Sequence, residues 1–348
     1  MDTPAELRLT KTVNRGGCAA KLEAGSLATL LAGLPRQEHP DLLVGTDFLD
    51  DAAVWRISEE RLLVQTVDFF TPILDDPRDF GAVAAANALS DIFAMGGRPF
   101  SALTVLAFPS ATLPGSVLTE LMAGATERIN AAGALLVGGH SIDDDTLKLG
   151  FSVNGFVATG QMWSNRGARP GDRLLLTKAV GTGTLTGGLK NDEVTAADLA
   201  EAIESMKLLN LLDLPPDLRE AVHAATDVTG FGLLGHSLHI ARGSNVTIEI
   251  EAGSVPLLAN ARETLGRGIV TRAHGSNTTY VAAAVAGRES ISELDWLALV
   301  DPQTSGGLLL SVAGERAQEL LAAVRPRFPR AELIGTVSIA GERPIVVR

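Results

Sequence analysis

A set of aspartates gives the sequence its clearest chemical signal. Each lies near a turn or near the end of an expected helix or strand. Carboxylates that converge in one pocket repel each other and take up protons, unless a hard cation such as Mg²⁺ holds them and offers a surface for polyphosphate. Each aspartate taken alone is also typical of a helix cap or turn. The set is Asp50, Asp51, Asp68, Asp91 and Asp227.

The lone cysteine, Cys18, stands in the segment Arg15-Gly-Gly-Cys-Ala-Ala-Lys21. A single cysteine is most often a small buried hydrophobic residue. This one is surrounded by glycine and charge, and neighbouring cations lower a thiol pKa and favour the reactive thiolate. The residues alone therefore leave a structural and a reactive role equally open.

Glycine-rich turns give weaker signals. Gly138-Gly-His-Ser141 follows an apolar run and could place backbone N–H groups against a phosphate, whereas Gly181–Gly183 and Ser305–Gly307 are equally compatible with plain turns. None carries the Gly-Lys-Ser/Thr ending of a phosphate-binding loop. His236 and His239 lie three residues apart on an expected helix, where helix packing or surface exposure is favoured over a metal pair.

Apolar periodicity predicts the elements that position these residues in the first half of the chain. Asn87 and Asp91 are four residues apart on one of these helices and so share a face. We expect helices at 21–34, 79–95 and 114–132 and strands at 62–67, 101–108, 135–137 and 149–157.

The second half also mixes apolar residues at helical spacing with apolar runs typical of strands. We place a domain boundary between residues 157 and 158. The fold class is therefore α+β, with domains 1–157 and 158–348. We expect strands at 173–177, 246–251, 308–312, 332–337 and 344–347 and helices at 196–211, 216–225, 232–241 and 315–324.

Composition narrows the classes of function. The 348 residues carry a formal charge of −12 and 46% hydrophobic residues, which suits a globular protein and argues against binding nucleic acid or an anionic membrane. One cysteine excludes an internal disulfide. The first residues lack the apolar core of a signal peptide and no apolar run suits a membrane span, so we expect a cytoplasmic protein.

Taken together, these segments resemble selenophosphate synthetase (selenide, water dikinase), a family of the aminoimidazole ribonucleotide synthetase-like superfamily. The resemblance runs along nearly the whole chain. It is carried by Gly17-Cys-Ala-Ala-Lys21, Asp50-Asp-Ala-Ala-Val54, Thr66-Val-Asp-Phe-Phe70, Ala86-Asn-Ala-Leu-Ser-Asp-Ile-Phe-Ala-Met-Gly-Gly97, Gly138-Gly-His-Ser-Ile142, Thr226-Asp-Val-Thr-Gly-Phe-Gly-Leu-Leu-Gly-His236 and Asp301-Pro-Gln-Thr-Ser-Gly-Gly307.

The resemblance implies a two-domain subunit whose N-terminal domains pair into a homodimer with a shared β-barrel, while the C-terminal domain is an α/β sandwich. It implies ATP and selenide as substrates, Mg²⁺ as cofactor, and a selenium-delivery protein as a partner. The implied reaction converts ATP, hydrogen selenide and water into selenophosphate, AMP and orthophosphate.

The same resemblance assigns roles to individual residues. Cys18 and Lys21 match catalytic positions, and Lys21 also matches a phosphate contact. The matched metal positions are Asp51, Asp91 and Asp227. The matched nucleotide positions are Lys21, Phe48, Leu49, Asp50, Asp68, Asp91, Gly139, His140 and Ser141.

Two departures from the family pattern stand out. Many relatives carry a second cysteine in the first loop, where this chain has Ala19 and Ala20, so a disulfide within the loop is unavailable. Relatives often carry Arg-Asn near the position of Gly275, where this chain has Ser276 and Asn277, so no role is assigned to that arginine.

Two other functions remain open at this point. One is a different ATP-dependent enzyme of the superfamily that acts on an amine or phosphate substrate. The other is a non-catalytic nucleotide-binding scaffold. Selenide-dependent AMP formation separates both from a selenide-dependent dikinase.

Overall fold

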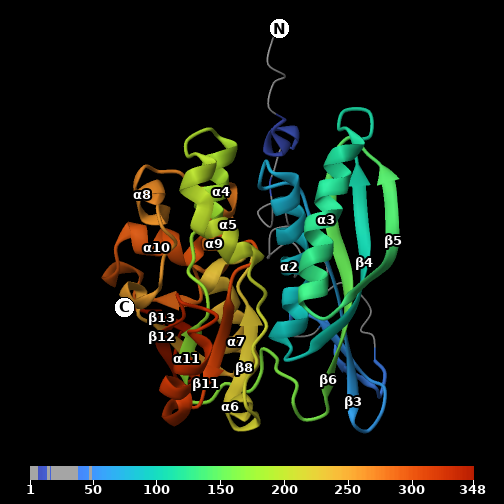
Figure 1. Ribbon diagram of the computed structural model, residues 1–348. Helices are drawn as coiled ribbons and strands as arrows, with labels where there is room; N and C mark the ends of the chain where they lie inside the picture. Colours follow the sequence, from blue (N-terminus) through green and yellow to red (C-terminus); the bar gives the residue numbers. More distant parts are fainter. Residues whose placement is uncertain (1–6, 14–15, 17–37, 47–48) are drawn as a thin grey trace.

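The computed structural model describes residues 7–13, 16, 38–46 and 49–348, and it builds them around two β-sheets (Figure 1). The first sheet belongs to the N-terminal half and has the strand order β1-β2-β3-β6-β4-β5. Its strands are β1 (Leu42–Val44), β2 (Ala53–Arg56), β3 (Arg61–Phe70), β4 (Arg98–Phe108), β5 (Leu135–Asp143) and β6 (Lys148–Ala158).

Two helices, α2 (Pro77–Ala94) and α3 (Gly115–Ala131), cover one face of this sheet. Proline at its first position and the Asp76 side chain, which accepts a hydrogen bond from the backbone N–H of Asp79, start α2. The two helices pack so closely that a Cβ on Gly81 would lie 1.9 Å from the carbonyl oxygen of Leu121. Glycine is therefore required where they cross.

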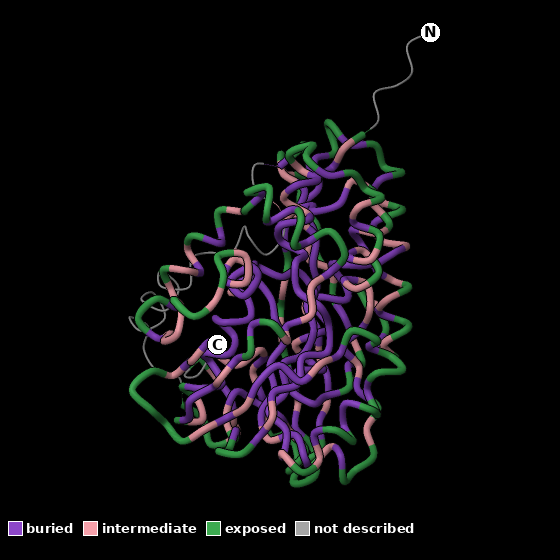
Figure 2. The backbone as a smooth tube through the Cα atoms, turned by 90° about the vertical axis from the view of Figure 1, so that its left-hand side faces the viewer, coloured by how far each residue is buried: buried purple, intermediate pink, exposed green. Residues whose placement is uncertain are grey.

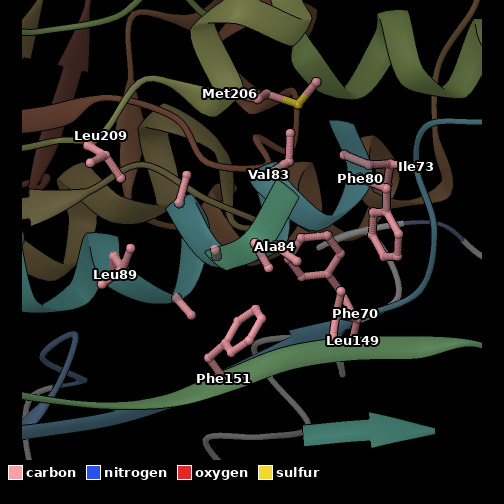
Figure 3. Close-up of a cluster of buried hydrophobic side chains, with 14 of the residues drawn as sticks. Phe70, Ile73, Phe80, Val83, Ala84, Leu89, Leu149, Phe151, Met206 and Leu209 are labelled. Atoms are coloured by element: carbon pink, nitrogen blue, oxygen red, sulfur yellow. The ribbon is translucent and has the colours of Figure 1, made fainter. Parts of the chain in front are cut away.

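Helix α2 is buried on nearly all sides, although only one of its faces meets the first sheet. In Figure 1 it lies between that sheet and the C-terminal half. Figure 3 shows Phe70, Leu149 and Phe151 beneath the helix, and Met206 and Leu209 of the C-terminal half above it. One apolar core thus joins the two halves through α2.

The second sheet has the strand order β10-β13-β9-β12-β7-β11-β8 and is mixed, because β13 pairs in parallel with β9 and β10 while the other pairs are antiparallel. Its strands are β7 (Arg173–Leu176), β8 (Val222–Asp227), β9 (Val246–Ile250), β10 (Val285–Ala286), β11 (Leu308–Val312), β12 (Glu332–Ile339) and β13 (Ile345–Val347). Its helices are α4 (Thr182–Lys190), α5 (Ala200–Lys207), α6 (Pro216–Glu220), α7 (Gly232–Ser244), α8 (Ala261–Gly266), α9 (Arg272–Val281), α10 (Glu293–Val300) and α11 (Ala317–Val324).

The α+β fold class is confirmed, but several predicted elements are wrong in detail. The predicted helix 216–225 ends at Glu220 and is followed by β8, since a short apolar run does not distinguish a helix from a buried strand. The predicted helix 196–211 ends at Lys207, and helices α4, α8, α9 and α10 were not predicted. The predicted helix 21–34 lies outside the described residues.

Figure 2 shows buried backbone running through the centre of both halves, with exposed backbone at the rim. The outer face of the first sheet is different, because exposed apolar side chains gather there. They are Val67, Phe69, Phe100, Leu103, Leu135, Val137 and Ile142. Within the described residues, no helix combines the length and apolar character needed to cross a bilayer.

Candidate active site

Strand β3 and helix α2 hold two of the aspartates from opposite sides. Thr66 and Asp68 are two residues apart on β3, so both side chains point toward the helices. The Thr66 hydroxyl donates to Asp91 Oδ2, and Asn87 Nδ2 donates to Asp68 Oδ2 at 2.5 Å. The predicted shared face of Asn87 and Asp91 is confirmed, and it lies toward β3. Asp68, predicted at a strand end, lies within β3 instead.

The loop between β1 and β2 brings Asp50 to the C-terminal half. Asp50 Oδ1 accepts a 2.7 Å hydrogen bond from the backbone N–H of Asn165, and Asn165 Nδ2 donates to the Leu49 carbonyl at 3.0 Å. Leu49 has a backbone φ of 52°, which is strained for a side chain of that size. The Asn165 contacts hold this strained turn in place.

Asp51 meets Asp227, which ends strand β8. Ligand atoms of Asp51, Asp227 and His236 all lie within 4.8 Å of one another. The Thr226 hydroxyl donates to Asp51 Oδ1 at 2.9 Å. Residues more than 170 positions apart in the chain therefore share one buried cluster, which we name the carboxylate cluster: Asp50, Asp51, Asp91 and Asp227.

Electrostatics within the carboxylate cluster strongly favour a cation. Burial, followed by the nearby charges of Asp227, Asp91 and Asp50, raises the pKa of Asp51 well above its ordinary value. Burial also raises the pKa of Asp50. Asp50 Oδ2 and Asp51 Oδ2 are shielded from solvent and accept no hydrogen bond from any described residue. These oxygens are suitable ligands for a hard divalent cation.

His236 is better suited to hold the cluster in place than to bind the cation. The backbone N–H of Thr229 donates to His236 Nε2 at 3.1 Å, so the proton of the neutral ring sits on Nδ1. That nitrogen faces Thr226 Oγ1 at 3.5 Å. The oxygen ligands that remain fit Mg²⁺ better than zinc. His239 packs against Tyr280, with 3.0 Å between Nε2 and the phenol oxygen. This agrees with the predicted packing role.

A buried polar chain ties this site to the C-terminal half. The backbone N–H of Ser305 donates to Asn87 Oδ1 at 2.9 Å, and Lys178 Nζ donates to the Ser305 carbonyl at 3.1 Å and to the Leu208 carbonyl at 2.6 Å. Burial lowers the pKa of Lys178 to about 7, and the charge of Asp227 opposes that fall. The segment Ser305–Gly307 is therefore a structural link between the halves.

Replacing Asn87 with leucine should destabilise the protein by about 1–3 kcal/mol, because the buried N–H of Ser305 then loses its acceptor. Urea unfolding measures the change. Gln65→Ala is the control, since Gln65 of β3 donates to Asn154 of β6 at 3.0 Å on the outer face of the first sheet, away from Ser305. Equal stability losses in the two variants would contradict the proposed link.

Other predicted site residues do not join the carboxylate cluster within one chain. Gly139, His140 and Ser141 lie inside β5 rather than in a turn after a strand. The order β3-β6-β4-β5 puts them three strands from Asp68, roughly 14 Å at the usual strand spacing. Gly139 is needed locally, because a Cβ there would lie 2.4 Å from the Thr104 carbonyl oxygen. Cys18, Lys21 and Phe48 lie outside the described residues.

Several residues of the site were absent from the predicted set. Thr66 could have been found from its spacing of two from Asp68, which puts both on one face of a strand. Thr226 adjoins Asp227 in the quoted motif. Asn165 and Lys178 gave no signal, since only the folded chain brings them to the site.

Comparison with known proteins covers both halves. Residues 49–157 match the AIR synthase related protein N-terminal domain, and residues 169–347 match its C-terminal domain. The chain is 50% identical to selenide, water dikinase of Bdellovibrio bacteriovorus over 99% of both chains. It is 48% identical to selenide, water dikinase of Nitrosomonas eutropha over 96% of both chains.

Solved structures share the fold. Thiamine-monophosphate kinase from Stenotrophomonas maltophilia matches with a TM-score of 0.62 at 24% identity, covering 94% of this chain and 96% of that one. Hydrogenase maturation protein HypE in complex with ATP matches with a TM-score of 0.61 at 20% identity, covering 92% and 91%. On the sequence matches, this chain belongs to the AIR synthase related family, and within it to the selenide, water dikinases.

Proposed function

We propose that this chain makes selenophosphate from ATP, selenide and water and releases AMP and orthophosphate. The observation that carries the proposal is the carboxylate cluster, which appears in a chain about half identical to selenide, water dikinases along its whole length. Buried carboxylates from both halves offer a cation site of the kind that holds polyphosphate.

We assign Asp51, Asp91 and Asp227 to Mg²⁺. ATP would contact Leu49, Asp50, Asp68, Asp91 and the phosphate-contacting Lys21, together with Phe48. The bound cation would neutralise charge on the phosphate oxygens, which is the main requirement of phosphoryl transfer. We also propose a domain boundary between residues 157 and 158, supported by family matches that end at residue 157 and resume at residue 169.

The chemistry divides into two cleavages. In the first, the selenium lone pair forms a P–Se bond to the γ-phosphorus while the bond to the ADP oxygen breaks. Lys21 adds positive charge as that oxygen leaves. In the second, water attacks the β-phosphorus of retained ADP, which leaves AMP and orthophosphate. Hydroselenide is anionic at neutral pH, so the first cleavage needs no general base for the nucleophile.

Cys18 would contact selenium rather than phosphorus. Its sulfur is a soft partner for selenium, and transient Se–S contact or transfer from a delivery protein uses that property. A lone cysteine and a reduced substrate also suit a reducing compartment, so we propose a cytoplasmic enzyme.

We propose a homodimer formed through the outer face of the first sheet. Two strands illustrate the exposed apolar face: on β5, Leu135 and Val137 are 64% and 59% exposed, and on β3, Val67 is 57% exposed. A contiguous apolar face of this kind is typical of an interface. A second copy could also supply Gly139, His140 and Ser141 to the nucleotide, which the same chain places three strands away.

Replacing Val137 with glutamate should therefore give a monomer with weakened ATP binding. The charge would be buried without a partner at the interface. Analytical ultracentrifugation and ATP titration measure the two effects. Ile339→Glu is the control, because Ile339 is 79% exposed but lies on β12 of the second sheet. A Val137→Glu protein that stays dimeric would refute this interface.

Phosphorus NMR of the reaction tests the proposed function. With ATP and Mg²⁺, selenide should produce a selenium-bonded phosphate signal together with AMP. AMP formation that does not depend on selenide would favour another superfamily enzyme. ATP binding without turnover would favour a scaffold.

A further inference from the structure

A cavity of about 230 Å³ lies between helix α4 and the residues that follow β3, and no residue of the carboxylate cluster lines it. Helix α4 forms one wall with Gly183, Thr186, Gly187 and Lys190, whose spacing of three and four residues puts them on one helix face. The two glycines on this face add no side-chain bulk to the cavity.

The charge of this cavity is opposite to that of the whole chain. Lys190 and Arg272 line it, and among the described residues that line it none is acidic, although the chain carries a formal charge of −12. A neighbouring cavity is lined by Asp75, Asp76 and Asp192 together with Arg8, which pairs with Asp75 and Asp192. The first cavity therefore favours an anion.

Lys190 supplies the charge from a partly buried position. Its Nζ donates one hydrogen bond to the Val13 carbonyl at 2.5 Å, and an ammonium group has three N–H donors. Burial, and then the nearby charge of Lys11, lowers the pKa of Lys190. An anion in the cavity would oppose that shift by stabilising the ammonium form.

Apolar surface shares the lining with these cations. Pro72, Ile73, Val270 and Pro302 contribute to the walls. A soft, weakly hydrated anion tolerates such surface better than a hard oxyanion, which needs more hydrogen-bond donors. This mixture fits hydroselenide better than orthophosphate.

The cavity also adjoins the segments that follow Asp68 and precede Ser305. Pro72 and Ile73 follow the strand that carries Asp68, and Thr304 precedes Ser305, which bonds Asn87 beside Asp68. Gly16 lines the same cavity, and a Cβ on Gly16 would lie only 2.9 Å from the Pro72 carbonyl oxygen.

We propose that this cavity is the acceptor site, which binds hydroselenide through Lys190 before phosphoryl transfer. The inference rests on the proposed function and names the place where its second substrate enters. Lys190 is assigned to binding selenide, not to binding ATP.

Lys190→Gln tests the assignment by its effect on each substrate separately. The KM for selenide should rise about tenfold or more, the scale of a lost hydrogen bond to a charged group, while the KM for ATP changes less than about twofold. Lys11→Gln is the matched control. This variant removes one positive charge near Lys190, but Lys11 pairs with Asp192 and does not line the cavity. Equal changes in both KM values, or the same change in both variants, would overturn the proposal.

A second measurement does not depend on turnover. Crystals of the wild-type protein soaked anaerobically with hydroselenide should show an anomalous selenium peak inside the cavity, and Lys190→Gln crystals should not. A peak elsewhere, or none, would overturn the acceptor site even if selenophosphate forms. A peak in the cavity without selenophosphate would instead refute the proposed function.

Discussion

Replacing Asp51 with asparagine will reduce Mg²⁺-dependent AMP formation by about 100-fold or more, since a lost metal ligand removes several kcal/mol of transition-state stabilisation. The same change should stabilise the metal-free fold. Asp51 is held among Asp227, Asp91 and Asp50, and a neutral amide removes that repulsion. Without metal, the variant should therefore have a higher Tm than the wild type, and Mg²⁺ should raise the Tm of the variant by less.

The stability of the metal-free protein should also depend on pH. The pKa of Asp51 is higher in the folded protein than in the unfolded chain, so as the pH rises above about 4 Asp51 loses its proton first in the unfolded chain. The free energy of unfolding of the metal-free wild type should therefore fall between about pH 4 and the raised pKa of Asp51. Asp51→Asn should not show this part of the fall, because asparagine does not titrate. Asp213→Asn is the control, because the Asp213 side chain is 94% exposed and pairs with Arg98 at the surface. Near wild-type AMP formation by Asp51→Asn would remove Asp51 from the metal site.

Lys21→Ala and Cys18→Ser should fail in different ways. Loss of Lys21 removes a cation from the phosphates, and the cost of a missing transition-state cation is roughly 10³-fold in kcat. Lys21→Arg should also be poor, since a planar fork does not replace a compact ammonium. Cys18→Ser should lose most selenophosphate formation yet keep its ATP affinity.

These different effects are measured by titrating each variant with ATP and by measuring its rate of selenophosphate formation. A Cys18→Ser protein that loses ATP affinity but keeps its turnover per bound ATP would contradict it. Because Ala19 and Ala20 offer no second thiol, oxidation should give sulfenic acid or an intermolecular adduct at Cys18. Mass spectrometry of the oxidised protein checks that outcome.

Sequence patterns predicted the parts of the site that depend on local geometry. The spacing of Asn87 and Asp91 placed them on one helix face, and the quoted aspartates include the whole carboxylate cluster. Periodicity could not show that Asp51 meets Asp227, because that contact depends on how two sheets dock around α2. It could not find Lys178, whose partners are backbone carbonyls brought together by folding.

Strand β5 shows the same limit in another way. Gly138–Ser141 looked like a turn because glycine interrupts strand patterns, yet the chain continues there as a strand beside β4. The residue types were compatible with nucleotide binding, but the topology places them away from the carboxylate cluster of the same chain. A distance of that kind is a property of strand order, which no local pattern contains.

The two-sided burial of α2 constrains how such proteins can diverge. One face of this helix fits its own sheet and the other fits Met206 and Leu209 of the following half. A gene fusion that joins the first half of this protein to the second half of a distant relative would inherit only one of those fits. Exchange of whole halves should therefore be rare in the evolution of this architecture, and new specificities should arise by substitution around the fixed helix.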